Sequence, residues 1–103
     1  MSVLLEFAMF PTDKGDSVSE YVSKIILMIN DKGYSYKLTA MGTIVETETL
    51  AEALQVIQES YNVLEPYSDR VYSSVNFDIR KGKTNRLEQK IISIESKIGK
   101  INT

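Results

Sequence analysis

The stretch LTAMGTIVETET, residues 38–49, decides the fold that the sequence predicts. Two runs typical of β-strands meet at Met41 and Gly42, where a glycine favours a tight turn. A capping signal and an apolar pattern with helical periodicity follow the second run. We therefore expect a hairpin followed directly by a helix. Glu46 lies close to Thr43 on the outgoing strand, so it is either an ordinary strand-end acid or a carboxylate carried into a ligand site.

The composition narrows the class of protein. The chain has 103 residues, of which 43% are hydrophobic and 25% charged, as expected for one soluble domain spanning residues 1–103. A net charge of −2 argues against a general nucleic-acid binder, which needs a basic face. The chain contains neither cysteine nor histidine, which excludes disulfides, thiolate metal sites and Ser-His-Asp catalysis. No apolar run approaches the roughly 20 residues of a membrane span, and we expect a cytoplasmic location.

Two elements are predicted before the hairpin. Residues 2–10 form a strand with two largely apolar faces, which is typical of a central strand. Residues 17–33 form a helix, in which Ser17 and Glu20 have the spacing of a capping box. Its apolar stripe consists of Val18, Val22, Ile25 and Ile29.

Three further elements are predicted after the hairpin. A helix spans residues 49–66, where Thr49 and Glu52 repeat the capping-box spacing. We expect its buried stripe to be Leu50, Leu54, Ile57, Tyr61 and Leu64. A strand spans residues 70–81, and its core side is expected to carry Val71, Val75, Phe77 and Ile79. The last helix begins near Thr84, with a stripe of Leu87, Ile91, Ile94, Ile98 and Ile101.

This order of elements predicts an α+β fold, the ferredoxin-like βαββαβ sandwich with an additional C-terminal helix. Two helices cover one face of a four-stranded antiparallel sheet and leave the other face open. The last helix has an apolar stripe without a place in that two-layer core. We therefore expect a homo-oligomer in which this helix packs across the interface; the alternative is that it folds back on its own sheet.

Three short motifs resemble those of a known family. They are Pro11 with SVSEYV at residues 17–22, MGTIVE at residues 41–46, and FDIR at residues 77–80. Their order and spacing resemble the thiamine-binding protein family of YkoF-like, ferredoxin-like small domains, over nearly the whole chain. The chain departs from the family pattern at Ala40, where a proline is expected, and at Thr47, where a glycine is expected.

The resemblance implies a fold, a ligand and an assembly. Members are ferredoxin-like domains that form dimers or tetramers and bind thiamine or its hydroxymethylpyrimidine part without known catalysis. We therefore expect thiamine or a related pyrimidine as the ligand, with no metal, no other cofactor, no nucleic acid and no membrane as partners.

The candidate ligand residues follow from what thiamine requires. Its cationic thiazolium and flat aminopyrimidine call for a carboxylate, an apolar wall and hydrogen-bonding groups. Glu46 is the expected carboxylate, and Thr43 the expected hydrogen-bonding residue, since both belong to the family motif. Ser17 is expected to cap its helix and also to contact the ligand from the preceding loop.

Five other residues complete the expected site. Asn76 and Asp78 lie on the polar side of the last strand and either face the ligand or form a solvated face. Phe7, Met9 and Tyr36 would form a wall for a flat ring, although apolar strand residues more often form the core.

Two other functional classes remain open from the sequence. The first is a structural or regulatory self-assembling domain without a dedicated ligand. The second is an enzyme that depends on Glu46 or Asp78 as acid or base, although no paired-carboxylate spacing supports it. The basic run KGKTNR at residues 81–86 would attract a phosphate or form a solvated loop.

Overall fold

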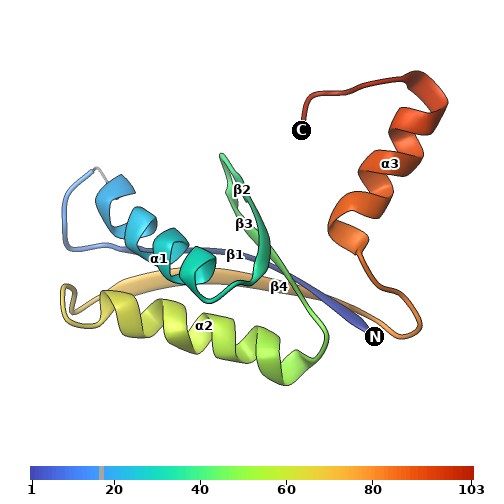
Figure 1. The fold of residues 1–103 in the computed structure, drawn as a ribbon. Helices are drawn as coiled ribbons and strands as arrows, with labels where there is room; N and C mark the ends of the chain where they lie inside the picture. Colours follow the sequence, from blue (N-terminus) through green and yellow to red (C-terminus); the bar gives the residue numbers. More distant parts are fainter. Residues whose placement is uncertain (17) are drawn as a thin grey trace.

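The sandwich is built from four strands and three helices. The computed structural model describes residues 1–16 and 18–103. Along the chain the elements are β1 (Ser2–Pro11), α1 (Ser19–Asp31), β2 (Ser35–Thr39), β3 (Gly42–Thr47), α2 (Leu50–Leu64), β4 (Val71–Arg80) and α3 (Arg86–Ile98). The strands form one antiparallel sheet in the order β2-β3-β1-β4, with α1 and α2 against one face (Figure 1). The expected ferredoxin-like α+β fold with an additional C-terminal helix is confirmed.

Strand β1 lies in the middle of the sheet, between β3 and β4. Leu5 is opposite Val45 on one side and Phe77 on the other. The alternate residues Val3, Leu5, Phe7 and Met9 point toward the helices and are buried. The helical layer explains why this face of the strand is apolar, whereas on the open face Leu4, Ala8 and Phe10 are half-buried and Glu6 is exposed.

Helix α2 packs through a different face from the one the sequence predicts. The buried residues are Ala53, Val56, Ser60 and Leu64, whereas Leu50, Leu54 and Tyr61 are exposed. Small side chains at 53 and 60 allow the helix to approach the sheet closely, and the Ser60 hydroxyl donates to the Val56 carbonyl inside the helix. The expected stripe was therefore wrong except at its C-terminal end, Leu64, and in part at the half-buried Ile57.

The predicted cap of α2 is confirmed at Thr49, but Glu52 returns its contact to the Thr49 hydroxyl and not to the backbone N–H of a capping box. Thr49 accepts a hydrogen bond from the Glu52 N–H at 3.1 Å, and its hydroxyl donates to the Glu52 carboxylate at 3.0 Å. In α1 the buried residues are Ile25 and Ile29, both within the predicted stripe. The predicted capping residue Ser17 lies outside the described residues.

The far end of β4 is less buried than the sequence predicts. Phe77 and Ile79 lie on the helix-facing side but are 39% and 46% exposed. Helices α1 and α2 lie over β1, and α2 also over β3, while β4 forms the edge of the sheet. Helix α2 also contacts β4, and Val71 and Val75 pack against the core, so only the far end of this edge strand is left uncovered. The alternation of its side chains is the expected one.

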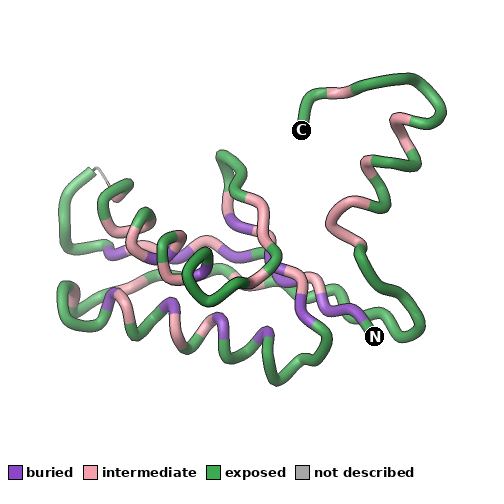
Figure 2. Tube along the Cα trace, viewed as in Figure 1, coloured by how far each residue is buried: buried purple, intermediate pink, exposed green. Residues whose placement is uncertain are grey.

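Helix α3 extends away from the sandwich (Figure 1) and contains no buried residue (Figure 2). It does not cover the open face of the sheet, and Ile98 is 72% exposed. Ile101, the last residue of the predicted stripe, lies beyond the end of the helix. Among the described residues, no helix is long and apolar enough to cross a membrane.

Candidate functional site

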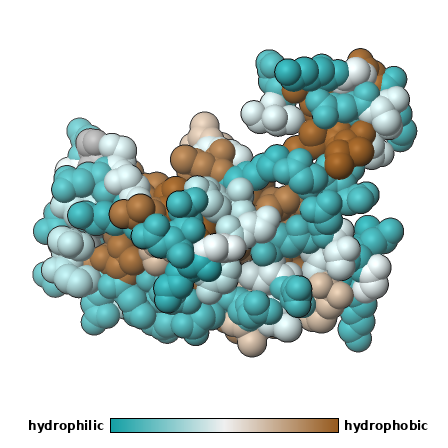
Figure 3. Space-filling model, viewed as in Figure 1, coloured by the Kyte–Doolittle hydropathy of each residue, from teal (hydrophilic) through white to brown (hydrophobic). Residues whose placement is uncertain are grey.

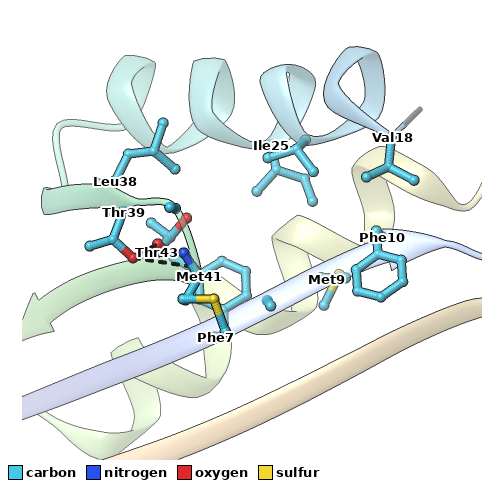
Figure 4. A pocket seen from close by; sticks show the side chains of 13 residues that line it. Phe7, Met9, Phe10, Val18, Ile25, Leu38, Thr39, Met41 and Thr43 are labelled. Atoms are coloured by element: carbon cyan, nitrogen blue, oxygen red, sulfur yellow. Dashed lines mark hydrogen bonds between the residues drawn. The ribbon is translucent and has the colours of Figure 1, made fainter. Parts of the chain in front are cut away.

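A cavity of about 230 Å³ lies between α1, the end of β1 and the β2–β3 hairpin. Figure 4 shows Phe7 and Met9 on the strand side, Ile25 on the helix side and Met41 at the hairpin. The complete lining is Phe7, Ala8, Met9, Phe10, Val18, Val22, Ile25, Leu38, Thr39, Ala40, Met41, Gly42 and Thr43. None of these side chains is ionisable at neutral pH, so the cavity suits an uncharged group with an apolar face.

The hairpin turn that borders the cavity is held by one threonine. The Thr39 hydroxyl donates to the Gly42 carbonyl and accepts from the N–H groups of Met41 and Gly42. Gly42 lies so close to β1 that a Cβ atom there would come within 2.8 Å of the Phe7 carbonyl oxygen. The glycine of the MGT motif is therefore required by packing between two strands.

Three predicted ligand residues line this cavity. Phe7 and Met9 come from β1 and Thr43 from β3, and all three are at most 6% exposed. Tyr36 shares their face of the sheet but lies outside the cavity wall, and its hydroxyl donates to the Asn30 side chain at 3.3 Å. The contact predicted for Ser17 concerns a residue that the structure does not describe.

Glu46 lies on the opposite face of the sheet and contacts α3. Its carboxylate accepts hydrogen bonds from the Ser2 hydroxyl at 2.5 Å, from the Arg86 N–H at 2.9 Å and from the Leu87 N–H at 3.2 Å. A strand residue thus caps the first turn of α3, which the side chain of the preceding Asn85 does not cap.

Arg86 completes this contact from the helix side. Its guanidinium donates to the Ser2 hydroxyl and carbonyl and to the Asp78 carbonyl, and it lies 3.3 Å from the Asp78 carboxylate. We call Ser2, Glu46, Asp78 and Arg86 the α3 anchor. Burial raises the pKa of Glu46, but the hydrogen bonds from Ser2, Arg86 and Leu87 outweigh it and hold that pKa below its usual value.

The predicted residues of the last strand also lie on this second face. Asn76 and Asp78 border a shallow groove on the open side of the sheet, together with Leu4, Glu6 and Ile44. Glu46 instead borders a depression of about 380 Å³ that Tyr34, Glu48 and Glu52 also line. The structure therefore separates the predicted residues that it describes: three line the cavity, Tyr36 lies outside its wall, and Glu46, Asp78 and Asn76 lie at the α3 anchor or on the open face.

Sequence reasoning missed the helix and hairpin sides of the cavity. Val18, Val22 and Ile25 have helical spacing and were interpreted only as core. Leu38 and Met41 flank the turn and are 59% and 88% exposed. Two apolar residues beside a glycine-containing turn were the available signal in the sequence. Apolar surface gathers beside the hairpin and on α3 (Figure 3).

The described residues contain no cluster of three side chains suited to hold a metal ion. The fold and the site together define a small ferredoxin-like α+β domain with an uncharged cavity between its first helix and its hairpin. The chain belongs to the thiamine-binding protein family, whose model matches residues 5–95. The family is named for ligand binding and is not an enzyme family.

Relatives cover almost the whole chain. A UPF0045 protein of Mycobacterium bovis is 33% identical over 95 residues, which are 92% of this chain and 93% of that protein. The crystal structure of a hypothetical protein from Methanocaldococcus jannaschii is 38% identical, with a TM-score of 0.77 over 90% of this chain and 95% of that one. A Thermotoga maritima protein, provisionally named for thiamine biosynthesis or salvage, shares the fold at 21% identity, with a TM-score of 0.78 over 91% and 99% of the two chains.

Proposed function

We propose that this chain is a non-catalytic binding protein for thiamine or its hydroxymethylpyrimidine moiety. The observation that supports the proposal is the uncharged cavity at the MGT motif, in a chain of the thiamine-binding family. An engineered apolar cavity of about 150 Å³ is enough to bind benzene. A cavity of about 230 Å³ therefore has room for one substituted six-membered ring, the size of the pyrimidine.

The cavity wall offers the contacts that such a ring needs. Phe7 provides an aromatic surface and Met9 a polarisable thioether, both suited to the face of a flat ring. Thr43 adds a hydroxyl to the wall, with which the edge of a pyrimidine would form a hydrogen bond. Because the wall carries no carboxylate, the cationic thiazolium of thiamine would project through the open side toward solvent.

Glu46 provides a second possible position for the ligand. In that arrangement the thiazolium would lie in the depression with Glu46, Glu48 and Glu52. The Glu46 carboxylate is already engaged by Ser2, Arg86 and Leu87, so it has less capacity left for a ligand. We therefore favour the cavity, and the following experiment distinguishes the two positions.

Isothermal titration calorimetry with thiamine and with hydroxymethylpyrimidine tests the proposal. Thr43→Val removes one hydroxyl while keeping the branched shape, and it should weaken binding about five- to tenfold, the value of one hydrogen bond. Thr47→Val is the matched control, because Thr47 lies on the same strand and face, is similarly buried and lies outside the cavity. Its affinity should equal that of the wild type.

Three results are decisive. If neither compound gives a binding signal with the folded wild-type protein, the proposal of ligand binding is rejected. A loss of affinity in Glu46→Gln with none in Thr43→Val places the ligand at Glu46. Equal losses in Thr43→Val and Thr47→Val attribute the effect to stability and count against the cavity.

A specific observation supports self-association as well. Helix α3 buries none of its residues, although an apolar stripe runs along one side of it and Ile98, in that stripe, is 72% exposed. The stripe consists of Leu87, Ile91, Ile94 and Ile98. We propose that a second copy of the chain covers this apolar side, because isolated helices of this length are marginal in water. Ile98→Asp should lower the molar mass measured by light scattering, while Lys97→Asp, on the same turn, should not. A wild-type protein that is monomeric at high concentration would contradict this assembly.

A further inference from the structure

A second cleft lies between the end of β4, the loop of residues 81–85 and the first turns of α3. Its volume is about 670 Å³. The side chains that give it its chemical character are Asp78, Arg80, Lys83, Arg86, Gln89 and Lys90. It shares no residue with the cavity at the MGT motif.

The positive charge of this cleft is largely uncompensated. Asp78 and Arg86 form an ion pair with each other at 3.3 Å. Within the described part of the chain, no carboxylate lies within ion-pair distance of Arg80, Lys83 or Lys90.

Glu88, the acidic residue of the first turn of α3, does not neutralise the cleft either. Its carboxylate lies 2.9 Å from the ammonium group of Lys37 on β2, and Glu88 is not part of the lining.

The sequence shows the same local excess of positive charge. Residues 80–90 contain five of the twelve Lys and Arg residues of the chain and a single carboxylate, although the whole chain has a net charge of −2. A concave surface lined by one sign of charge attracts ions of the opposite sign. On an acidic protein, this cleft is the place where a small anion is favoured.

We propose that this cleft binds the phosphate or diphosphate group of a small molecule. Arg80 can donate two parallel hydrogen bonds to phosphate oxygens, and Lys83 and Lys90 add two mobile ammonium groups. Gln89 and Thr84 add uncharged donors from α3 and the loop. The Arg86 guanidinium already bonds Ser2 and Asp78, so it holds the cleft in shape while the other three cations contact the anion.

The test is calorimetry and phosphorus NMR on the full chain with inorganic pyrophosphate, and with sulfate for comparison. Wild-type protein should bind pyrophosphate more tightly than sulfate. The double variant K83A/K90A should bind it about tenfold more weakly, since it removes two charged hydrogen-bond donors. The control K14A/K97A removes the same charge from the β1–α1 loop and the last turn of α3, and its affinity should stay within about twofold of the wild type.

Two further titrations distinguish a free diphosphate from the diphosphate group of an organic molecule. Thiamine diphosphate is compared with thiamine in wild-type protein and in K83A/K90A. A diphosphate recognised alone gives equal wild-type affinities for pyrophosphate and thiamine diphosphate, whereas recognition of the organic part as well gives a tighter affinity for the latter. In both cases K83A/K90A should lose about tenfold, and both outcomes support the cleft. No response to pyrophosphate, equal binding of sulfate, or equal losses in both double variants would overturn it. Thiamine binding is measured separately, so either proposal can fail without the other.

Discussion

Removal of the Glu46 carboxylate should release α3 from the sheet while leaving the sandwich folded. Glu46→Ala deletes the acceptor of three hydrogen bonds, two of which come from backbone N–H groups at the start of α3. The helix has no buried residue to hold it in place. Among the described residues, its remaining polar attachments to the sheet are the Arg86 contacts to Ser2 and Asp78 and the Lys37–Glu88 ion pair.

The size of the effect follows from these contacts. Loss of a helix N-cap costs about 0.5–2 kcal/mol. For Glu46→Ala we expect a free-energy cost in the upper part of this range, about 1–2 kcal/mol. The acceptor is charged and partly buried, and an anion also interacts favourably with the helix dipole. A change of this size shifts the equilibrium between docked and released α3 by a factor of about 5–30.

Amide hydrogen exchange measures this release directly, because it reports local opening separately from global unfolding. In Glu46→Ala, amides of Arg86–Ile98 should exchange about 5–30 times faster, while those of β1 should keep wild-type rates. Glu48→Ala, which removes a nearby exposed carboxylate with no recorded contact to α3, should leave all rates unchanged. Unchanged exchange in α3 of Glu46→Ala, or equal acceleration in Glu48→Ala, would refute the anchoring role.

Four other changes have defined outcomes. Gly42→Ala places a Cβ against the Phe7 carbonyl oxygen and should cost about 1–3 kcal/mol in urea unfolding; unchanged stability would mean that the two strands separate without penalty. Thr49→Ala removes the cap of α2 and should cost about 0.5–2 kcal/mol, measured in the same way, with a midpoint equal to that of the wild type as the contrary result. Leu5→Ala empties a fully buried position and should cost about 2–5 kcal/mol by thermal or urea unfolding, and a cost below 1 kcal/mol would contradict the central position of β1. The lowered pKa of Glu46 stabilises the folded state above its ordinary pKa, and this contribution disappears as the pH falls through the folded-state value. The protection of α3 amides, taken relative to the intrinsic exchange rate at each pH, should therefore fall in wild-type protein as the pH drops below the ordinary pKa of a glutamate, but not in Glu46→Gln. A pH profile shared by both proteins would exclude Glu46 as its source.

The order of the elements was available from the sequence because it depends on local signals. The Thr49–Glu52 signal concerns residues three positions apart, and in the structure the Thr49 hydroxyl accepts the predicted hydrogen bond from the Glu52 N–H. The two apolar faces of residues 2–10 indicated a central strand, and β1 occupies that position. Such patterns are determined by the backbone periods of strands and helices, which do not depend on distant parts of the chain.

The packed face of α2 could not be chosen in this way. The helix has large apolar residues on one side, such as Leu54, and small ones beside them, such as Ala53. Hydropathy favours the large side chains, but the distance of closest approach to the sheet favours the small ones. The distance between α2 and the sheet is set only when the helical layer packs on the strands, so the sequence pattern does not reveal it.

The position of the candidate site also depends on how the helices and the sheet assemble. The sequence by itself determined a hairpin with a glycine at its turn, a central apolar strand and an acid on the outgoing strand. Only the tertiary structure decided that Thr43 and Phe7 meet α1 around one cavity, and that Glu46, which alternation places on the other face, caps a helix 40 residues further along the chain. Side chains alternate across a strand, so neighbours in the motif lie on opposite faces, and the partners of each face come from segments that folding alone brings together.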